Sequence, residues 1–515
     1  VIEPLSSVLA QQQPFQAVGS GGGLTFGANT PNQPGSSSRL GQLNRLRYEA
    51  DEIQFQGNVW EATNVRITND PFSPPELELR SSRVTVTPLT ATQTEIRARN
   101  PRLVFDQGFT LPLLRDRVVI DSRQRSSGLF SFGYDERDRG GLFIERPFEF
   151  PIGTVSLLRL TPQILIQRAL DEDGFGSLSS YGLIARLDVQ PTPVTSIVGN
   201  AVFTSLDPED FEDTFRGSIR AKQVFARHTF NLEYSYRNRL YNGSLGYQSV
   251  RSSLGFLVNS PNIVLGSSQI NLTYQAGIQL INSDANGTRL GDPDIVDLLP
   301  PIDPVTFTRP NNRITLARYQ GVASLNRFFF LWAGTPLPST PEAGLRYTST
   351  PIVPYVAMLL SGRGVLSGYS NGDFQSVFTG SAGLYAQFGH FSKPFLDYTG
   401  INISYSYNAV GGETPFDFDR VNDIQVLDVG LTQQIVGPLR AGFRSSFYLE
   451  SLDLNRDDTS DTTFFIEYSR RTYAITLSYS PNREAGAINF RVNDFNWTGT
   501  PDPFSGLKPS SEPGT

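Results

Sequence analysis

Most of the chain alternates between apolar and polar residues with a period of two. In FNLEYSY (230–236), Phe, Leu and Tyr point one way, while Asn, Glu and Ser point the other. LTYQAGIQL (272–280) and INISYSY (401–407) repeat the pattern, as do YAITLSYS and AINFRVN near the C-terminus. Such alternation predicts β-strands with two different faces. No segment shows the period of an amphipathic helix, so we predict an all-β fold.

The region between Tyr48 and Ile120 carries shorter alternating runs. Asn-Asp-Pro, Pro-Pro and Asn-Pro separate them and are turn signals. We therefore predict a small antiparallel unit with one apolar face. The residues that would form this face are Val65, Ile67, Leu77, Leu79, Val84, Val86, Leu103 and Phe105.

Composition and pattern divide the chain into four parts. Residues 1–45 are rich in Gln, Gly, Ser and Pro and hold too few apolar residues to form a core, so we predict a flexible leader. We assign 46–139 to the small β unit, 140–498 to the long alternating strands and 499–515 to a C-terminal tail. The chain should therefore contain two structured parts of different kinds.

The long strands fit either a soluble sandwich or a transmembrane barrel, because alternation alone does not show which face meets water. Their length, sufficient to cross a bilayer at a tilt, favours the barrel. Their polar rows suit a wet interior, and Tyr and Phe recur near strand ends, as in an aromatic girdle. We predict a large antiparallel transmembrane β-barrel of about 20–26 strands. A soluble or surface β-rich binding protein is the alternative.

Charge and composition argue against several other classes of protein. The net charge of −7 disfavours a nucleic-acid partner. There is no cysteine, so disulfides and thiolate metal sites are impossible. No uncharged apolar stretch is long enough for a membrane-spanning helix. The two histidines, His228 and His390, have no pairing that indicates a nucleophilic triad, and we expect neither an enzyme nor a cofactor.

Two acidic runs, at 207–213 and 455–461, are candidates for binding divalent cations that bridge sugar phosphates. Solvated loops explain these runs equally well, and we prefer that interpretation. The segment 284–294 resembles a calcium loop but lacks the Glu expected at the twelfth position. We therefore predict no metal site.

One region carries motifs in a recognisable order. NVRITNDPFSPPELELRSSRVTVTP and IRARNPRLVFDQGFTLPLL are followed by SSGLFSFGYDERDRGGLFIERPFEF. RPFEF and LTPQILIQR then carry Pro147 and Pro162, which are 15 positions apart. In this order the stretches resemble the LptD (OstA/Imp) family of lipopolysaccharide-assembly proteins: the end of its periplasmic β-jellyroll, its crossover, and its first two barrel strands with one proline each. The chain departs from that family in its short jellyroll and in lacking the cysteines that link the two domains.

The resemblance implies a protein of the bacterial-type outer membrane with its N-terminal domain in the periplasm. It would take lipopolysaccharide or a similar glycolipid from a periplasmic jellyroll bridge (LptA-like) and insert it among the outer-membrane lipids. The apolar face of the small unit would shelter the acyl chains on the way. A plug lipoprotein (LptE-like), as in much of that family, is left open.

The resemblance also gives Pro147 and Pro162 a role in a lateral gate at the seam between the first and last strands. Proline cannot donate a ladder hydrogen bond, so the two residues would weaken that seam. The alternative is that both are edge or bulge prolines without function. The alternative to a translocon is a passive porin or substrate-specific channel with an N-terminal plug.

Overall fold

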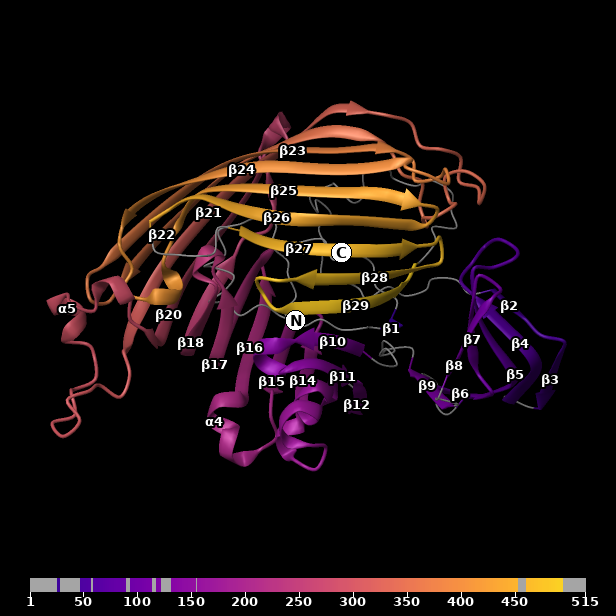
Figure 1. Ribbon diagram of the computed structural model, residues 1–515, viewed down its shortest axis with the longest axis horizontal. Coiled ribbons are helices and arrows are strands. Elements are labelled where there is room, and N and C mark those ends of the chain that lie inside the picture. Colours follow the sequence, from indigo (N-terminus) through magenta and orange to yellow (C-terminus); the bar gives the residue numbers. More distant parts are fainter. Residues whose placement is uncertain are drawn as a thin grey trace.

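The protein folds into a barrel and a separate N-terminal sheet (Figure 1). The computed structural model describes residues 26–27, 47–56, 59–88, 93–113, 117–121, 131–153, 155–452 and 460–493. None of the helices in these residues is long and apolar enough to cross a membrane. The predicted all-β fold is confirmed.

The barrel is closed and antiparallel and has 18 strands, fewer than expected. The predicted number of strands is too high because each long alternating segment can be interpreted as two strands. β21, for example, is a single strand of 21 residues. In the wall, β11 and β12 form one strand with a break, and so do β18 and β19. The strand bounds are β10 Ser131–Asp135, β11 Gly141–Glu145, β12 Phe148–Ile152, β13 Ser156–Leu165, β14 Tyr181–Thr192, β15 Thr195–Phe203, β16 Phe215–Phe225, β17 His228–Tyr241, β18 Tyr247–Asn259, β19 Ile263–Val264, β20 Asn271–Asp284, β21 Arg313–Ala333, β22 Tyr355–Tyr369, β23 Phe374–Gly389, β24 Tyr398–Gly412, β25 Asp423–Val436, β26 Leu439–Ser451, β27 Ser460–Ser469, β28 Tyr473–Ser480 and β29 Ala485–Val492.

The wall is apolar outside and polar inside. In β17, Leu232 is 52% exposed and Tyr234 is 47% exposed, while Asn231, Glu233 and Ser235 between and beside them are 5% exposed or less. A soluble sandwich would bury the first set and expose the second. The prediction of a membrane-type barrel over a soluble sandwich is therefore confirmed, and the arrangement fits an outer-membrane protein.

The two ends of the barrel differ. At the end near the N-terminal sheet, several strands are joined by two-residue turns, such as 193–194 and 437–438. At the far end the connections are longer and carry most of the helices (Figure 1). The helical segments are α2 Glu136–Arg139, α3 Ile166–Arg168, η1 Ala169–Asp173, η2 Leu178–Ser180, η3 Pro208–Asp210, α4 Phe211–Thr214, η4 Gly243–Leu245, η5 Gly266–Ser268, η6 Gly287–Arg289, α5 Pro293–Val296 and η7 Asp417–Asp419.

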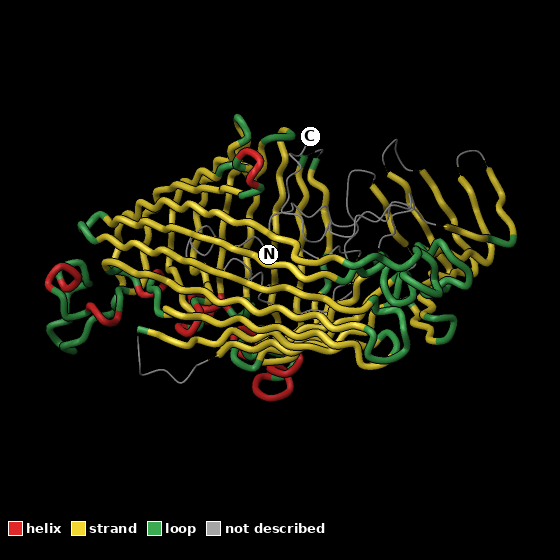
Figure 2. Tube along the Cα trace, turned by 90° about the horizontal axis from the view of Figure 1, so that it is seen from above, coloured by secondary structure: helices red, strands yellow, loops and turns green. Residues whose placement is uncertain are grey.

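The N-terminal sheet has eight strands and lies beyond one end of the barrel rather than inside it, as Figures 1 and 2 both show. Its main order is β2-β4-β5-β6-β9, with β3 also paired to β4, and with β7 paired to β5 and β8. Its strands are β2 Arg47–Glu49, β3 Glu52–Gln56, β4 Val59–Thr68, β5 Leu77–Pro88, β6 Gln93–Arg99, β7 Arg102–Phe105, β8 Phe109–Pro112 and β9 Arg117–Asp121.

The boundaries of the parts can be compared with the expected ones. The barrel begins at Ser131, before the expected boundary at residue 140, because SFGYD already pairs with the last strand. Within the predicted leader, β1 (Phe26–Gly27) pairs in parallel with β29. The remainder of 1–45 and the predicted tail 499–515 lie outside the described residues.

Candidate functional site

The barrel closes at a short seam between β10 and β29. In the described part of the chain the two strands pair at three positions, Gly133 with Ala487, Tyr134 with Gly486 and Asp135 with Ala485. Beyond them, toward the N-terminal sheet, β29 pairs at two positions with β1 instead. By contrast, β21 and β22 pair at 15 positions. The seam is therefore the weakest join between neighbouring wall strands that the structure describes.

Side chains connect the two sides of the seam at the far end. The Glu136 backbone N–H donates to the carbonyl oxygen of Glu484 at 3.1 Å, and Arg137 Nε donates to the Glu484 carboxylate at 3.0 Å. The side chains of Arg137 and Glu484 are each 45% exposed. An ion pair this exposed adds little stability, so these contacts do not compensate for the small number of backbone pairs between β10 and β29.

The apolar face of the N-terminal sheet continues onto the seam strand. The Phe105 ring lies 5.2 Å from Tyr473, the first residue of β28, and 5.7 Å from Phe490 of β29. Leu77 is buried in the same cluster, and Leu103 packs against it. Buried apolar side chains therefore connect the sheet to Phe490, in the part of β29 that does not pair with β10.

The structure brings the eight apolar residues predicted for this face together in two adjoining groups. Val65, Val84 and Val86 are buried around Ala62, with Ile67 packed against them. Leu77, Leu103 and Phe105 form the second group, nearer the barrel. Leu79 pairs with Ile67 on one side and with Leu103 on the other, which places it between the groups.

The two predicted gate prolines lie one and two strands away from the seam strand β10. Pro147 falls between β11 and β12, where pairing with β13 stops at Glu145 and resumes at Phe148. Pro162 lies within β13. They are thus in the second and third wall strands, not the first two, because Ser131–Asp135 forms a strand ahead of them. Their break loosens the hairpin that carries β10, rather than the β10–β29 ladder itself.

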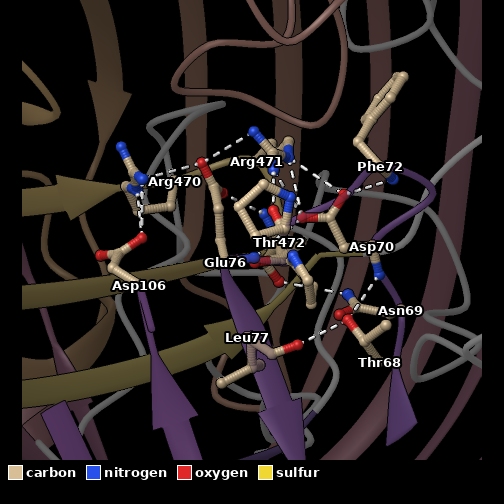
Figure 3. A network of polar contacts seen from close by, with 12 residues as sticks. Thr68, Asn69, Asp70, Phe72, Glu76, Leu77, Asp106, Arg470, Arg471 and Thr472 are labelled. Atoms are coloured by element: carbon tan, nitrogen blue, oxygen red, sulfur yellow. Dashed lines mark hydrogen bonds and ion pairs between the residues drawn. The ribbon is translucent and has the colours of Figure 1, made fainter. Parts of the chain in front are cut away.

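A buried charge network fastens the N-terminal sheet to the β27–β28 turn (Figure 3). Arg471 Nε donates to both carboxylate oxygens of Asp70, at 2.9 and 3.1 Å, and the Asp70 side chain is fully buried. The backbone N–H groups of Phe72 and Glu76 each donate to Asp70 at 3.0 Å. Asp70 therefore orders its own loop and binds the barrel with the same carboxylate.

Two further contacts extend this attachment of the sheet to the barrel, which we call the Asp70–Arg471 joint. Asn69 Nδ2 donates to the carbonyl oxygen of Asn493, just after β29, at 2.6 Å. Arg470 Nη2 lies 2.7 Å from Asp106 Oδ1 and 3.1 Å from Glu76 Oε1 (Figure 3). The N-terminal sheet is therefore held to the β28–β29 side of the seam.

Glu76 has an unusual protonation state for a carboxyl with two arginine neighbours. Burial raises its pKa to about 7, against the opposing charges of Arg470 and Arg471, and the nearby Asp70 and Asp106 raise it further. Three carboxyl groups share two guanidinium groups here, so a proton on Glu76 makes the network neutral. The sequence signal for this joint was a pair of adjacent arginines in a tight turn, which our sequence analysis did not single out.

A loop packs inside the far end of the barrel. Phe416 and Phe418, from the β24–β25 connection, are at most 1% exposed and pack against Leu240, Val250 and Ile281 of β17, β18 and β20. Asp419 Oδ2 lies 2.8 Å from Arg318 Nη1 of β21, whose side chain is fully buried. The segment 413–423 therefore crosses from one part of the wall to another, which the sequence analysis did not predict.

The candidate cation loops lie at this far end as well. Within the described residues, no group of three or more His, Cys, Asp or Glu side chains is placed to hold a metal ion. The acidic run 207–213 begins in a connection between β15 and β16, and 284–294 begins the connection to β21. Residues 455–459, most of the second acidic run, lie outside the described residues.

The comparison with protein families covers both structured parts. The model of a family described as a protein of unknown function (DUF3769) matches residues 40–496, which span the N-terminal sheet and the whole barrel. No curated protein shows significant similarity to the chain. The match extends over most of the sequence, and the chain belongs to the DUF3769 family.

Proposed function

We propose that this protein is an outer-membrane translocon that passes lipopolysaccharide or a similar glycolipid sideways through the β10–β29 seam. The observation that carries the proposal is the buried apolar cluster that joins Phe105 of the N-terminal sheet to Phe490 of the seam strand. Exposing acyl chains to water costs about 0.8 kcal/mol per methylene, so they need a sheltered route. The head group travels in the polar interior, and the chains pass through the seam.

The loop packed inside the far end supports a sideways exit over a straight channel. A passive porin needs a continuous wet passage, whereas the segment 413–423 packs across this interior with Phe416 and Phe418 buried. A substrate-specific channel with an N-terminal plug would hold its N-terminal domain in the lumen. The N-terminal sheet instead lies beyond the barrel end (Figure 2).

The N-terminal sheet also offers a place for delivery of the lipid. Its outer strands, such as β9 (Arg117–Asp121), pair on one side only among the described residues. A sheet edge of this kind can add a strand from another β protein. A periplasmic bridge of matching jellyrolls would dock there and extend the apolar face. Pro147 and Pro162 would then let the β10–β11 hairpin move as the seam parts.

A disulfide across the seam tests the proposal. An ideal Cβ on Gly486 would lie 3.6 Å from Tyr134 Cβ, which suits a disulfide between Tyr134→Cys and Gly486→Cys. The chain has no other cysteine to compete. A disulfide that contributes about 2–4 kcal/mol to the closed seam should lower the amount of new glycolipid at the cell surface by about tenfold or more. Reductant should restore it.

The matched control places a disulfide inside the continuous wall. Ser235 and Ser253 pair across β17 and β18, with their hydroxyl oxygens 2.8 Å apart, so S235C/S253C should cross-link without strain. This variant should export normally in both redox states. Full export by the oxidised seam variant, with cross-linking shown by its migration, would overturn the proposed lateral exit.

A further inference from the structure

The tip of the β10–β11 hairpin is held by two arginines from another part of the wall. Arg216 of β16 donates through both terminal nitrogens to the two Asp138 carboxylate oxygens, at 2.7 and 2.8 Å. Arg239 of β17 donates to the same carboxylate. The three side chains are 16–25% exposed. The cluster is therefore well ordered yet still open to solvent.

This cluster restrains one side of the seam. Asp138 lies in α2, directly after β10, and its carbonyl oxygen accepts a hydrogen bond from Arg168 Nη2 at 2.9 Å. Any movement of β10 away from β29 must carry α2 with it, because α2 begins at the residue after β10. The Asp138 ion pairs are thus among the contacts that must break or shift when the seam opens.

The tip of the β17–β18 hairpin touches both sides of the seam. The Arg137 guanidinium, from the β10 side, lies 5.2 Å from the Tyr247 ring centre. Arg483, from the β28–β29 turn, lies 4.1 Å from the Tyr241 ring centre. Tyr241 and Tyr247 face each other across the hairpin, with ring centres 5.1 Å apart. The hairpin that carries Arg239 therefore bridges the far end of the seam.

Protonation cannot release Asp138 near neutral pH. Burial raises the pKa of Asp138, but the hydrogen bond from Arg216 and the charges of Arg216, Arg239 and Arg139 lower it more, to about 2. The carboxylate therefore stays charged under physiological conditions. A competing anion can release it, and two guanidinium groups that converge on one carboxylate also suit the oxygens of a phosphate.

We propose that Arg216 and Arg239 form a phosphate site for the head group of the exported glycolipid, and that Asp138 occupies this site while the seam is closed. An arriving phosphate displaces Asp138 into solvent and takes over both guanidinium groups. The β10–β11 hairpin then loses its attachment to β16 and β17 and can leave β29. This inference rests on the proposed function, since it assigns a trigger to the same lateral exit.

The test uses the full chain with Tyr134→Cys and Gly486→Cys in detergent, where the rate of disulfide formation under a fixed oxidant reports how often the seam is closed. The probes are a bis-phosphorylated acylated glucosamine disaccharide, its dephosphorylated form, and inorganic phosphate. The phosphorylated glycolipid should slow cross-linking by about fivefold or more, in the range of ordinary coupling between two sites. The dephosphorylated form should leave the rate unchanged, and inorganic phosphate should slow cross-linking only at a much higher concentration than the phosphorylated glycolipid.

Variants of the Asp138 cluster separate phosphate binding from release of the β10–β11 hairpin. Asp138→Asn should slow cross-linking without any ligand, because the ion pairs that hold the β10–β11 hairpin to β16 and β17 are already lost. Arg216→Gln should abolish the response to the phosphorylated glycolipid. Arg186→Gln is the matched control, since Arg186 is 27% exposed and is paired with Asp188 in β14, away from the seam. Heat-modifiable migration of each variant checks that the barrel is folded.

Two outcomes would overturn the inference. One is an equal response to the phosphorylated and dephosphorylated glycolipids. The other is a normal response in Arg216→Gln. Either result leaves the lateral exit standing if the seam disulfide still blocks export, so failure of the phosphate site can be distinguished from failure of the proposed function.

Discussion

The β10–β29 and β21–β22 joins belong to one barrel wall but differ greatly in strength. The first pairs at three described positions and the second at 15. At roughly 1 kcal/mol for each net ladder hydrogen bond, the difference is on the order of 10 kcal/mol. Unpaired backbone groups are costlier still in hydrocarbon, so the remainder of the wall stays sealed. A barrel built in this way confines any opening to one place.

The two joins also differ in what holds them. β21–β22 is held along its length by backbone pairing, which cannot be altered without unfolding. Side chains anchor the two sides of the seam to other parts of the molecule: the Asp70–Arg471 joint attaches the N-terminal sheet to the β28–β29 side, and the Asp138 cluster attaches the β10 side to β16 and β17. Side-chain contacts respond to ligands and to pH, so the seam can be controlled while the wall cannot.

Removing Arg471 should have the largest effect. Arg471→Ala leaves the fully buried Asp70 carboxylate without its cation, which costs about 3–5 kcal/mol. The N-terminal sheet should detach from the barrel and become sensitive to limited proteolysis, while the barrel keeps its heat-modifiable migration. Arg83→Ala is the control, because its ion pair with Glu61 lies within the sheet and is 40–52% exposed. Unchanged protection in Arg471→Ala would contradict the role of this joint.

Replacing the two prolines should have an intermediate effect. Pro147→Ala with Pro162→Ala restores two backbone donors beside the seam, each contributing about 0.5–1.5 kcal/mol. The β10–β11 hairpin should become stiffer, and new glycolipid should reach the surface up to about tenfold more slowly. Pro301→Ala, in the far-end connection before β21, serves as the control and should change nothing. Export at the normal rate in the double variant would mean that the prolines are structural.

A pH change should have the smallest effect. The pKa of Glu76 is raised from 4.5 to about 7 in the joint, so docking of the sheet is strongest below pH 4.5 and weakens as the pH rises through 7. Between pH 6 and pH 8 the loss is roughly 1 kcal/mol. Proteolysis of the N-terminal sheet should therefore be faster at pH 8.

The Glu76→Gln variant gives the control for this pH dependence. It keeps the shape of the side chain but cannot lose a proton, so its proteolysis rate should be the same at both pH values. Asp70, Asp106, Arg470, Arg471, Tyr468 and Tyr473 are the charged or titratable neighbours that stay in place. A pH dependence that persists in Glu76→Gln would assign the effect to one of them.

The orientation of most side chains could be predicted from the sequence. The alternation in FNLEYSY separates Leu232 and Tyr234 from Asn231 and Glu233, and the structure exposes the first pair and buries the second. The apolar residues predicted in the N-terminal sheet pack into two clusters. Both results follow from local periodicity, which needs no knowledge of distant partners.

Features that depend on distant partners could not be predicted in this way. SFGYD is a wall strand because it meets β29, more than 300 residues later. Asp70 and Arg471 are separated by 401 positions, and neither lies in a motif that names the other. Phe416 and Phe418 lie in a polar, Pro-containing connection, and only their packing against Leu240 and Ile281 shows that this connection folds into the barrel.

The most direct test of sideways exit is photocrosslinking of the glycolipid from single positions on the outer face of the barrel. Ile488, on the seam strand β29, is 36% exposed, and Ile403, on β24, is 44% exposed. We expect a photoreactive residue at 488 to capture newly made glycolipid well above the level at 403, and the difference to disappear when the seam disulfide is oxidised. Equal capture at 488 and 403, with or without the disulfide, would contradict exit through the seam.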